Sequence, residues 1–168
     1  MSLILGIDPG SLKTGYGLIK VEGSTLKHID NGVIWLNSEQ EITQRIKKIY
    51  FKVKELLEQF KPEEVAIEKI FYAKNIKSLL RLGEARGAAI VAALTCGLEV
   101  SEYSALEVKK AVVGYGKAPK EQVQNMIRML LKLKENPLED AADALAVAMC
   151  HFQMSQYRKR LRMTEGQR

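Results

Sequence analysis

The chain has 168 residues, 46% of them hydrophobic and 27% charged, with a formal net charge of +6 and a pI of about 9.3. This length and composition predict one globular domain and exclude a disordered or fibrous protein. Two cysteines and two histidines are too few for a disulfide framework or a tetrahedral zinc site, while the basic surplus favours a polyanionic partner, either nucleic acid or an anionic membrane surface.

The N-terminal segment begins with a short apolar run over residues 3–7, which predicts a buried strand ending at Asp8-Pro9-Gly10. No basic segment precedes this run, so it does not resemble a signal peptide. The longest apolar helical stretch, residues 87–96, is too short to span a bilayer. We therefore expect a cytoplasmic protein without membrane contact.

The rest of the chain alternates strand and helix patterns. Strands are predicted at 15–21 and 27–36, joined by the turn Gly23-Ser24. Helical spacing of apolar residues then predicts an amphipathic helix over 39–60. The remaining expected elements are strands at 65–68 and 98–103 and helices at 75–95, 104–113, 120–133 and from 139 to 151 or beyond.

This order of elements predicts an α/β fold, with a three-stranded meander, two later strands, and helices on both faces of a mixed five-stranded sheet. We assign residues 1–152 to one domain. Residues 153–168 form a basic tail, which we expect to be flexible.

Four acidic residues lie in apolar or small-residue surroundings. Asp8 ends the first strand and Glu68 ends the fourth, so both carboxylates reach the same sheet edge if these strands are parallel neighbours. Asp140 and Asp143 lie three residues apart in the first turn of the last helix and share one face. An alternative role for each of these two is to cap that helix.

Carboxylates that converge without neighbouring cations repel one another, and a hard divalent cation removes the repulsion. Four carboxylates carry the charge that two Mg²⁺ ions neutralise, and paired ions stabilise the attacking and leaving oxygens of a phosphodiester. The pattern therefore predicts metal-assisted phosphodiester hydrolysis with water as the nucleophile.

The helix over 75–95 contains a run of small residues. Glycine inside a helix costs about 1 kcal/mol relative to alanine, so a helix that carries both Gly83 and Gly87 is expected to approach another backbone closely. We predict a dimer contact through Gly83, Arg86 and Gly87. Packing of this helix on the sheet of its own chain is the alternative.

Over residues 3–150 the chain resembles the RuvC family of Holliday-junction resolvases. The resemblance rests on five blocks in order: Gly6-Ile7-Asp8-Pro9-Gly10-Ser11, Thr14-Gly15-Tyr16-Gly17, Ala66-Ile67-Glu68, Leu82-Gly83-Glu84-Ala85-Arg86-Gly87 and Asp140-Ala141-Ala142-Asp143-Ala144. It implies an RNase H-like fold with the fourth and fifth strands parallel to the first. It also implies a homodimer that nicks two like-polarity strands of a four-way DNA junction symmetrically, leaving 5′-phosphate and 3′-hydroxyl ends.

The resemblance assigns roles to individual residues. Asp8, Glu68, Asp140 and Asp143 match the catalytic acids, which hold Mg²⁺, two ions per site with Mn²⁺ as a substitute. Phe71 matches an aromatic that stacks on bases, and Lys109 and Lys120 match basic residues near the scissile phosphate. Lys74 is a further candidate for phosphate contact, although each lysine could equally belong to a solvated face. The RuvA–RuvB branch-migration complex is the implied partner in recombination and DNA repair.

Three other functions remain open from the sequence. A nucleotide-binding phosphotransferase of the actin and hexokinase kind shares the Gly-Ile-Asp-x-Gly-Ser/Thr loop, but it needs a second phosphate loop. A non-catalytic DNA-binding module explains the basic charge but not the four acids. An RNase H-like nuclease acting on RNA–DNA hybrids would use the same acids.

Overall fold

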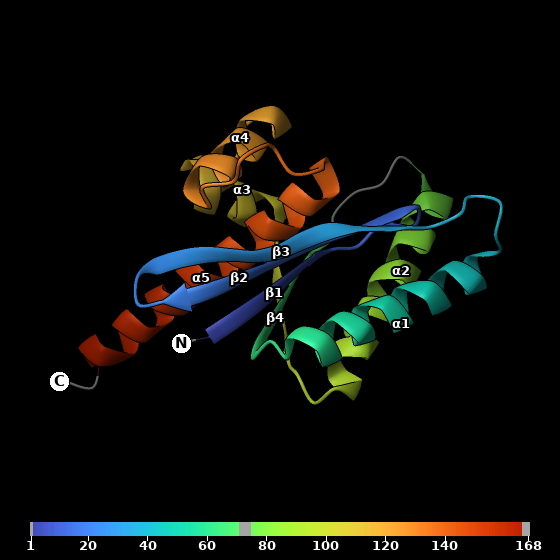
Figure 1. The fold of residues 1–168 in the computed structure, drawn as a ribbon, viewed down its shortest axis with the longest axis horizontal. Helices are drawn as coiled ribbons and strands as arrows, with labels where there is room; N and C mark the ends of the chain where they lie inside the picture. The colour runs from blue at the N-terminus through green and yellow to red at the C-terminus, as the bar shows by residue number, and fades with distance from the viewer. Residues whose placement is uncertain (1, 71–74, 166–168) are drawn as a thin grey trace.

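The computed structural model of the chain describes residues 2–70 and 75–165, with side chains as far as residue 162. Its elements follow the chain as β1 (Ser2–Asp8), β2 (Lys13–Glu22), β3 (Thr25–Trp35), α1 (Ile42–Phe60), β4 (Glu64–Glu68), α2 (Ile76–Thr95), β5 (Val100–Tyr103), α3 (Ala105–Val113), α4 (Lys120–Leu130) and α5 (Glu139–Glu165) (Figure 1).

Five strands of the described residues form one mixed sheet in the order β3-β2-β1-β4-β5. The pairs β1–β2 and β2–β3 are antiparallel, while β4 runs parallel to both β1 and β5. The hairpin between β2 and β3 turns at Gly23, whose φ of +64° is favourable for glycine. The predicted meander and the predicted parallel strands are both confirmed.

The sheet separates two apolar cores, because successive side chains of a strand point to opposite faces. Leu5 and Ile7 of β1 pack with α1 and α2. Ile4 of β1 and Ala66 of β4 belong to the other core, with α3, α4 and α5. Figure 1 shows these two groups of helices on opposite sides of the sheet. The expectation of helices on both faces is confirmed.

Helix α5 packs on the sheet with its backbone unusually close to β1 and β2. A Cβ added at Gly6 would lie 2.1 Å from the carbonyl oxygen of Ala144, and one added at Gly15 would lie 1.9 Å from that of Asp140. Neither position has room for a side chain. These glycines therefore set how closely the first turns of α5 approach the ends of β1 and β2.

Local sequence explains the starts of α2 and α3, and backbone conformation marks the end of α4. Asn75 caps α2 by accepting a hydrogen bond from the backbone of Ser78, and Ser104 and Glu107 form a capping box at α3. α4 ends at Leu130, three residues earlier than predicted, because Lys132 adopts a positive φ of 54°.

Helix α5 continues to Glu165, past the predicted domain boundary at residue 152, so residues 153–165 of the expected tail are helical. Within residues 2–70 and 75–165, no helix is both long and apolar enough to cross a membrane.

Candidate active site

Asp8 and Glu68 stand at the same edge of the sheet. Each follows one member of the parallel pair Ile7 and Ile67, and each lies two residues beyond a residue that faces α5. Both therefore point toward α5, whose second turn carries Asp143. Asp8, Glu68 and Asp143 line one cavity of about 400 Å³.

Burial and the neighbouring negative charges disfavour the ionised form of the three carboxylates in this cavity. Burial, and then the charges of Asp143, Glu68 and Asp140, raise the pKa of Asp8 well above its usual range. Burial and the charge of Asp143 raise the pKa of Glu68 to about 7. The pKa of Asp143 is also raised, chiefly by burial. Each carboxylate is therefore easier to protonate, or to pair with a cation, than one in water.

Lys120, the first residue of α4, provides positive charge at the cavity. Its Nζ donates to Glu139 Oε1 at 2.5 Å and lies 3.6 Å from Asp143 Oδ2. The hydrogen bond with Glu139, followed by the charge of Asp143, raises the pKa of Lys120. A cation therefore stands beside the acids, as the position expected for Lys120 implies, although the periodicity of the sequence does not reveal that α4 begins beside α5.

Asp140 holds a different position from the other three acids. It is half-buried, and its backbone carbonyl lies against Gly15 rather than facing the cavity. Its side chain is not among those that line the cavity. Its charge nevertheless raises the pKa of Asp8, after burial, Asp143 and Glu68. All four acids predicted from the sequence thus lie in one electrostatic neighbourhood.

In the described part of the chain, no group of three or more Asp, Glu, His or Cys side chains is arranged closely enough to hold a metal ion. The donor chemistry still fits a hard divalent cation, which prefers carboxylate oxygen. Three half-buried carboxylates share the cavity, and Lys120 and Lys109 offset their charge only in part. The residues present therefore suit Mg²⁺ in kind, with side-chain adjustment on binding.

The predicted DNA-contacting residues fall into two groups. Lys109 and Lys120 both line the cavity, and Lys109 Nζ also donates to the carbonyl oxygen of Ala118 at 2.9 Å, linking α3 to the segment before α4. Phe71 and Lys74 lie outside the described residues.

A residue that sequence analysis missed supports the loop after Asp8. Arg45 of α1 is only 4% exposed, and its guanidinium donates to the carbonyl oxygen of Ser11 at 3.0 Å. A signal was present, because Arg45 occupies the apolar face of its helix between Ile42 and Ile49. A charged residue at such a position has to reach a polar partner.

The glycines predicted for the dimer contact face open space within the chain. A Cβ added at Gly83 or Gly87 would meet nothing within 4 Å, so these two do not serve close packing on the sheet. Arg86 forms an ion pair with Glu102 of β5 in its own chain.

Comparison with known proteins gives one consistent result. The family model for "Crossover junction endodeoxyribonuclease RuvC" matches residues 4–151. A relative of that name from Citrifermentans bemidjiense is 56% identical over 149 residues, which cover 89% of this chain and 91% of that protein. Another from Marinobacter nauticus is 51% identical over 166 residues, covering 99% and 94% of the two chains.

The solved structure of Thermus thermophilus RuvC in complex with a Holliday junction substrate superimposes with a TM-score of 0.88. Its sequence is 34% identical, and the match covers 94% of this chain and 96% of that one. The RNase H-like fold class expected from the sequence is confirmed. Because both the sequence match and the structural match extend over most of its length, the chain belongs to the RuvC family of crossover junction endodeoxyribonucleases.

Proposed function

We propose that this nuclease resolves four-way DNA junctions by nicking two strands of like polarity symmetrically, with Asp8, Glu68, Asp140 and Asp143 holding Mg²⁺. The observation that supports this most is the shared cavity of Asp8, Glu68 and Asp143, in which neighbouring negative charge adds to burial in raising the pKa of Asp8 and of Glu68. The structural relative bound to a Holliday junction supports the substrate.

The residues at the cavity would have two roles, cation binding and attraction of the phosphate. Asp8, Glu68 and Asp143 would bind the cation from the cavity wall, and Asp140 would add negative charge from the first turn of α5. Bound Mg²⁺ activates water and neutralises charge on the phosphodiester, and Mn²⁺ is expected to substitute. Lys109 and Lys120 lie at the same cavity and would attract the scissile phosphate.

The decisive experiment uses a synthetic mobile junction with Mg²⁺. We expect paired nicks at symmetric positions that DNA ligase can reseal, since resealing requires 5′-phosphate and 3′-hydroxyl ends. Asp8→Asn should lower the nicking rate by about 10³-fold, equivalent to several kcal/mol of transition-state stabilisation, while junction binding persists. Asp30→Asn is the matched control, because Asp30 lies on β3 and contacts Tyr16 instead.

The same assay tests the other functions. Preferential cutting of an RNA–DNA hybrid would contradict the junction substrate, and ATP binding would favour the phosphotransferase. Junction binding without any nicking by the wild-type chain would indicate a non-catalytic DNA-binding module.

We also propose that the active form is a homodimer whose contact runs along α2. Ile76, Leu80, Val91 and Leu94 are 79%, 63%, 49% and 55% exposed. With Gly83 and Gly87 they recur at steps of three and four residues, so they form one apolar stripe. A two-fold dimer places one cavity on each of the two strands to be cut.

Association with the RuvA–RuvB complex rests on family membership alone. Co-elution of the three proteins on junction DNA, compared with RuvA–RuvB on the same DNA without this chain, would test it. The cytoplasm, where bacterial chromosomal DNA lies, is the compartment that this function requires.

A further inference from the structure

The positive charge of the chain is concentrated at its C-terminal end. Five of the 26 Lys and Arg residues, but only one of the 20 Asp and Glu residues, lie in residues 153–168. Four of the six net charges therefore belong to these 16 residues. In the described part of α5 the basic side chains are Arg158, Lys159, Arg160 and Arg162, all exposed. We call these four residues the basic cluster.

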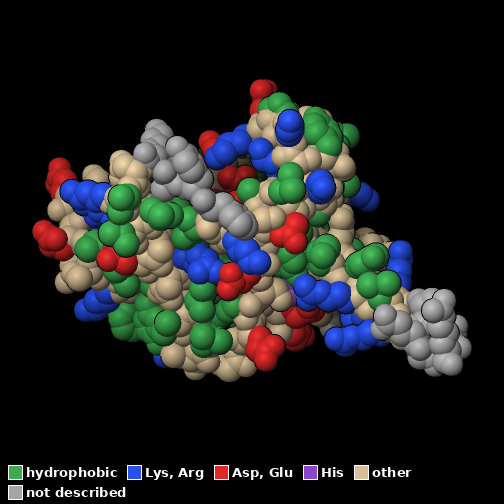
Figure 2. All heavy atoms as spheres, turned by 180° about the vertical axis from the view of Figure 1, so that it is seen from behind, with side chains coloured by type: hydrophobic (Ala, Val, Ile, Leu, Met, Phe, Trp, Pro, Cys, Tyr) green, Lys and Arg blue, Asp and Glu red, His purple; other side chains and the backbone are tan. Residues whose placement is uncertain are grey.

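The basic cluster is far from the catalytic cavity but rigidly connected to it. Arg158 and Arg162 follow Asp143 by 15 and 19 residues in the same helix. At about 1.5 Å per residue, this places the cluster about 22–28 Å from Asp143 along the helix axis. Figure 1 shows this end of α5 projecting beyond the sheet, and Figure 2 shows blue Lys and Arg side chains gathered there.

A hollow beside the cluster has the chemistry of an anion-binding surface. A cavity of about 450 Å³ lies between the β2–β3 turn and α5, and it is lined by Gly23, Ser24, Phe152, Gln153, Gln156, Tyr157 and Arg160. Tyr157 is 57% exposed. No carboxylate is among the described residues that line it. Arginine, amide, hydroxyl and backbone N–H groups are those that contact DNA phosphates and sugars.

Arg158, Lys159 and Arg162 form no close ion pair with the described acids around them. Within the described residues, no ion pair of 4 Å or less joins Arg158, Lys159 or Arg162 to a carboxylate. The charges of Arg158 and Lys159 act on Glu107 and Glu64 from a distance, but Glu107 also caps α3 and Glu64 also binds His151. Much of the positive charge of Arg158, Lys159 and Arg162 therefore remains available to an external polyanion.

We propose that residues 153–162 form an accessory arm that binds the phosphate backbone of a duplex arm of the junction. This inference rests on the proposed function, because the polyanion is the substrate's own duplex. At 3.4 Å per base pair, the contact lies about 6–8 base pairs from the cut. Because it reads phosphates and not bases, it adds affinity without sequence preference.

The test compares two variants that each lose three positive charges. Arg158→Gln, Lys159→Gln and Arg162→Gln are combined in one chain, and Lys47→Gln, Lys48→Gln and Lys134→Gln, all at exposed positions, are combined in the control. Junction affinity is measured without divalent metal over a series of salt concentrations. The substrates are junctions with arms of 20 base pairs and hairpin-closed junctions with arms of 5 base pairs.

On long arms we expect the cluster variant to bind about tenfold or more weakly. The negative slope of log K against log [salt] should become shallower by about 2–3, close to one unit for each lost phosphate contact. On 5-base-pair arms the variant and wild type should bind alike. A variant carrying Arg158→Lys and Arg162→Lys should retain wild-type affinity, and the control variant should retain the wild-type slope.

Equal salt slopes for the cluster variant and the wild type on junctions with long arms would refute the accessory arm of the protein. An equal loss of affinity on junctions of both arm lengths would also refute it. So would cluster-dependent binding of phosphatidylglycerol vesicles together with unchanged DNA binding, since that outcome assigns the cluster to a membrane surface. Nicking by the cluster variant at saturating protein should match the wild-type rate, because the four acids are intact. Failure of the proposed function would appear separately, as absence of nicking by the wild-type chain.

Discussion

Glu68, which we propose as a cation ligand, has a pKa near neutral pH. Burial and the charge of Asp143 raise its pKa to about 7. A carboxyl group with this pKa is half-protonated near neutrality and must lose the proton before it can hold a cation. Proton and metal therefore compete for the same side chain.

We expect the nicking rate at low Mg²⁺ to rise as the pH increases through about 7. Raising the Mg²⁺ concentration should shift this rise to lower pH, because the metal displaces the proton. Initial rates between about pH 5.5 and 8.5 at two Mg²⁺ concentrations would measure it. A pH profile that does not move with Mg²⁺ would contradict the competition.

The same pKa shift predicts an effect on stability in metal-free protein. Because the folded pKa of Glu68 exceeds its ordinary value of 4.5, the folded state binds more protons between pH 4.5 and about 7, and stability falls as the pH rises through that window. Glu68→Gln removes this loss. We compare the unfolding free energy of the variant with that of the wild type. We expect this difference to favour the variant by about 2 kcal/mol more at pH 8 than at pH 4.5.

Urea unfolding with EDTA at the two pH values would measure that gain. Glu139→Gln is the matched control, because hydrogen bonding to Lys120 lowers the pKa of Glu139. Glu139→Gln should therefore gain no stability at pH 8. A gain equal to that of Glu68→Gln would show that general charge reduction, and not the burial of Glu68, is the cause.

The grouping of the four acids could be predicted because each lies at the end of an apolar strand or in the first two turns of a helix, where a buried carboxylate is conspicuous. Lys120 could be assigned a role only by resemblance, since the packing of α4 beside α5 is a tertiary contact without local signal. Arg45 was missed for a different reason. Its place on an apolar helix face was visible, but its partner, the carbonyl oxygen of Ser11, lies 34 residues away.

At the scale of elements, the contact of α5 with β1 and β2 determines where Asp140 and Asp143 stand. Gly6 and Gly15 permit this contact, and a Cβ at either position would overlap backbone atoms of α5. The sequence instead predicts close backbone approach at Gly83 and Gly87, because glycine is conspicuous inside a helix. Glycine inside a strand also indicates close approach of another backbone, but the sequence around Gly6 and Gly15 does not reveal that α5 is the element that packs there.

Gly15→Ala should move the first turn of α5, since the new Cβ would lie 1.9 Å from the carbonyl oxygen of Asp140. We expect a loss of about 1–3 kcal/mol in unfolding free energy and a lower nicking rate at saturating Mg²⁺. Gly32→Ala is the control, because the atoms nearest to its Cβ would be the ring and hydroxyl of the Tyr16 side chain, and not the backbone of α5. An active, fully stable Gly15→Ala variant would contradict this account of α5.

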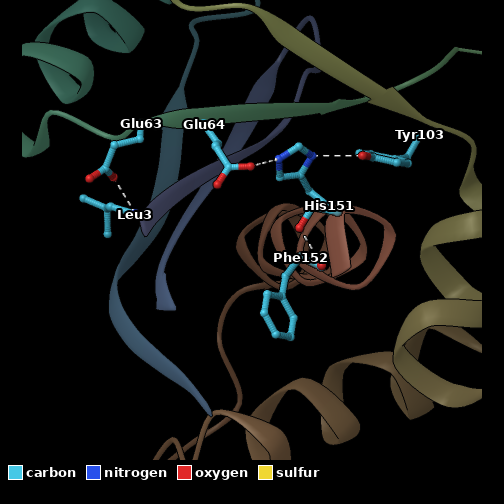
Figure 3. A network of polar contacts seen from close by, with 7 residues as sticks. Leu3, Glu63, Glu64, Tyr103, His151 and Phe152 are labelled. Atoms are coloured by element: carbon cyan, nitrogen blue, oxygen red, sulfur yellow. Dashed lines mark hydrogen bonds and ion pairs between the residues drawn. The ribbon is translucent and has the colours of Figure 1, made fainter. Parts of the chain in front are cut away.

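A buried polar network joins the middle of α5 to the sheet (Figure 3). The Tyr103 hydroxyl lies 2.9 Å from His151 Nδ1, and His151 Nε2 lies 2.6 Å from Glu64 Oε2. A neutral imidazole satisfies both contacts if Nε2–H donates to Glu64 and Nδ1 accepts from Tyr103. Glu64 begins β4 and Glu68 ends it, so the network lies away from the catalytic cavity and serves stability.

His151→Leu should lower the unfolding free energy by about 1–3 kcal/mol, because it leaves the buried Tyr103 hydroxyl and Glu64 without their partner. Adding Tyr103→Phe to His151→Leu should cost less than Tyr103→Phe alone, since the hydroxyl has already lost its bond. Urea unfolding of the three variants and the wild type measures this coupling. Strictly additive losses would show that the two side chains do not act together.

At the scale of the whole molecule, the sheet order and its two cores could be predicted, because strand and helix periodicity and the family motifs extend over most of the chain. The length of α5 could not. Residues 153–162 combine polar and basic side chains that alone are equally compatible with a solvated helix or a tail. Continuity with the buried segment 141–151 extends the helix, because propagation is easier than nucleation.

The apolar stripe of α2 provides a prediction for the assembly. Leu80→Glu places a charge on a side chain that is 63% exposed in the single chain and buried in the proposed dimer. We expect the variant to be a folded monomer by analytical ultracentrifugation, and to cut the two strands of a junction independently. Met129→Glu on α4, at a residue 66% exposed, should stay dimeric. A dimeric Leu80→Glu chain would exclude this contact.

The cavity takes Asp8 from the first strand, Glu68 from the fourth strand and Asp143 from the last helix. A nascent or truncated chain that lacks α5 has Asp8 and Glu68 but neither Asp140 nor Asp143. It also lacks the helix that covers one face of the sheet. Under the proposed assignment, a chain truncated before α5 keeps only two of the four acids and is expected to bind DNA without cutting it.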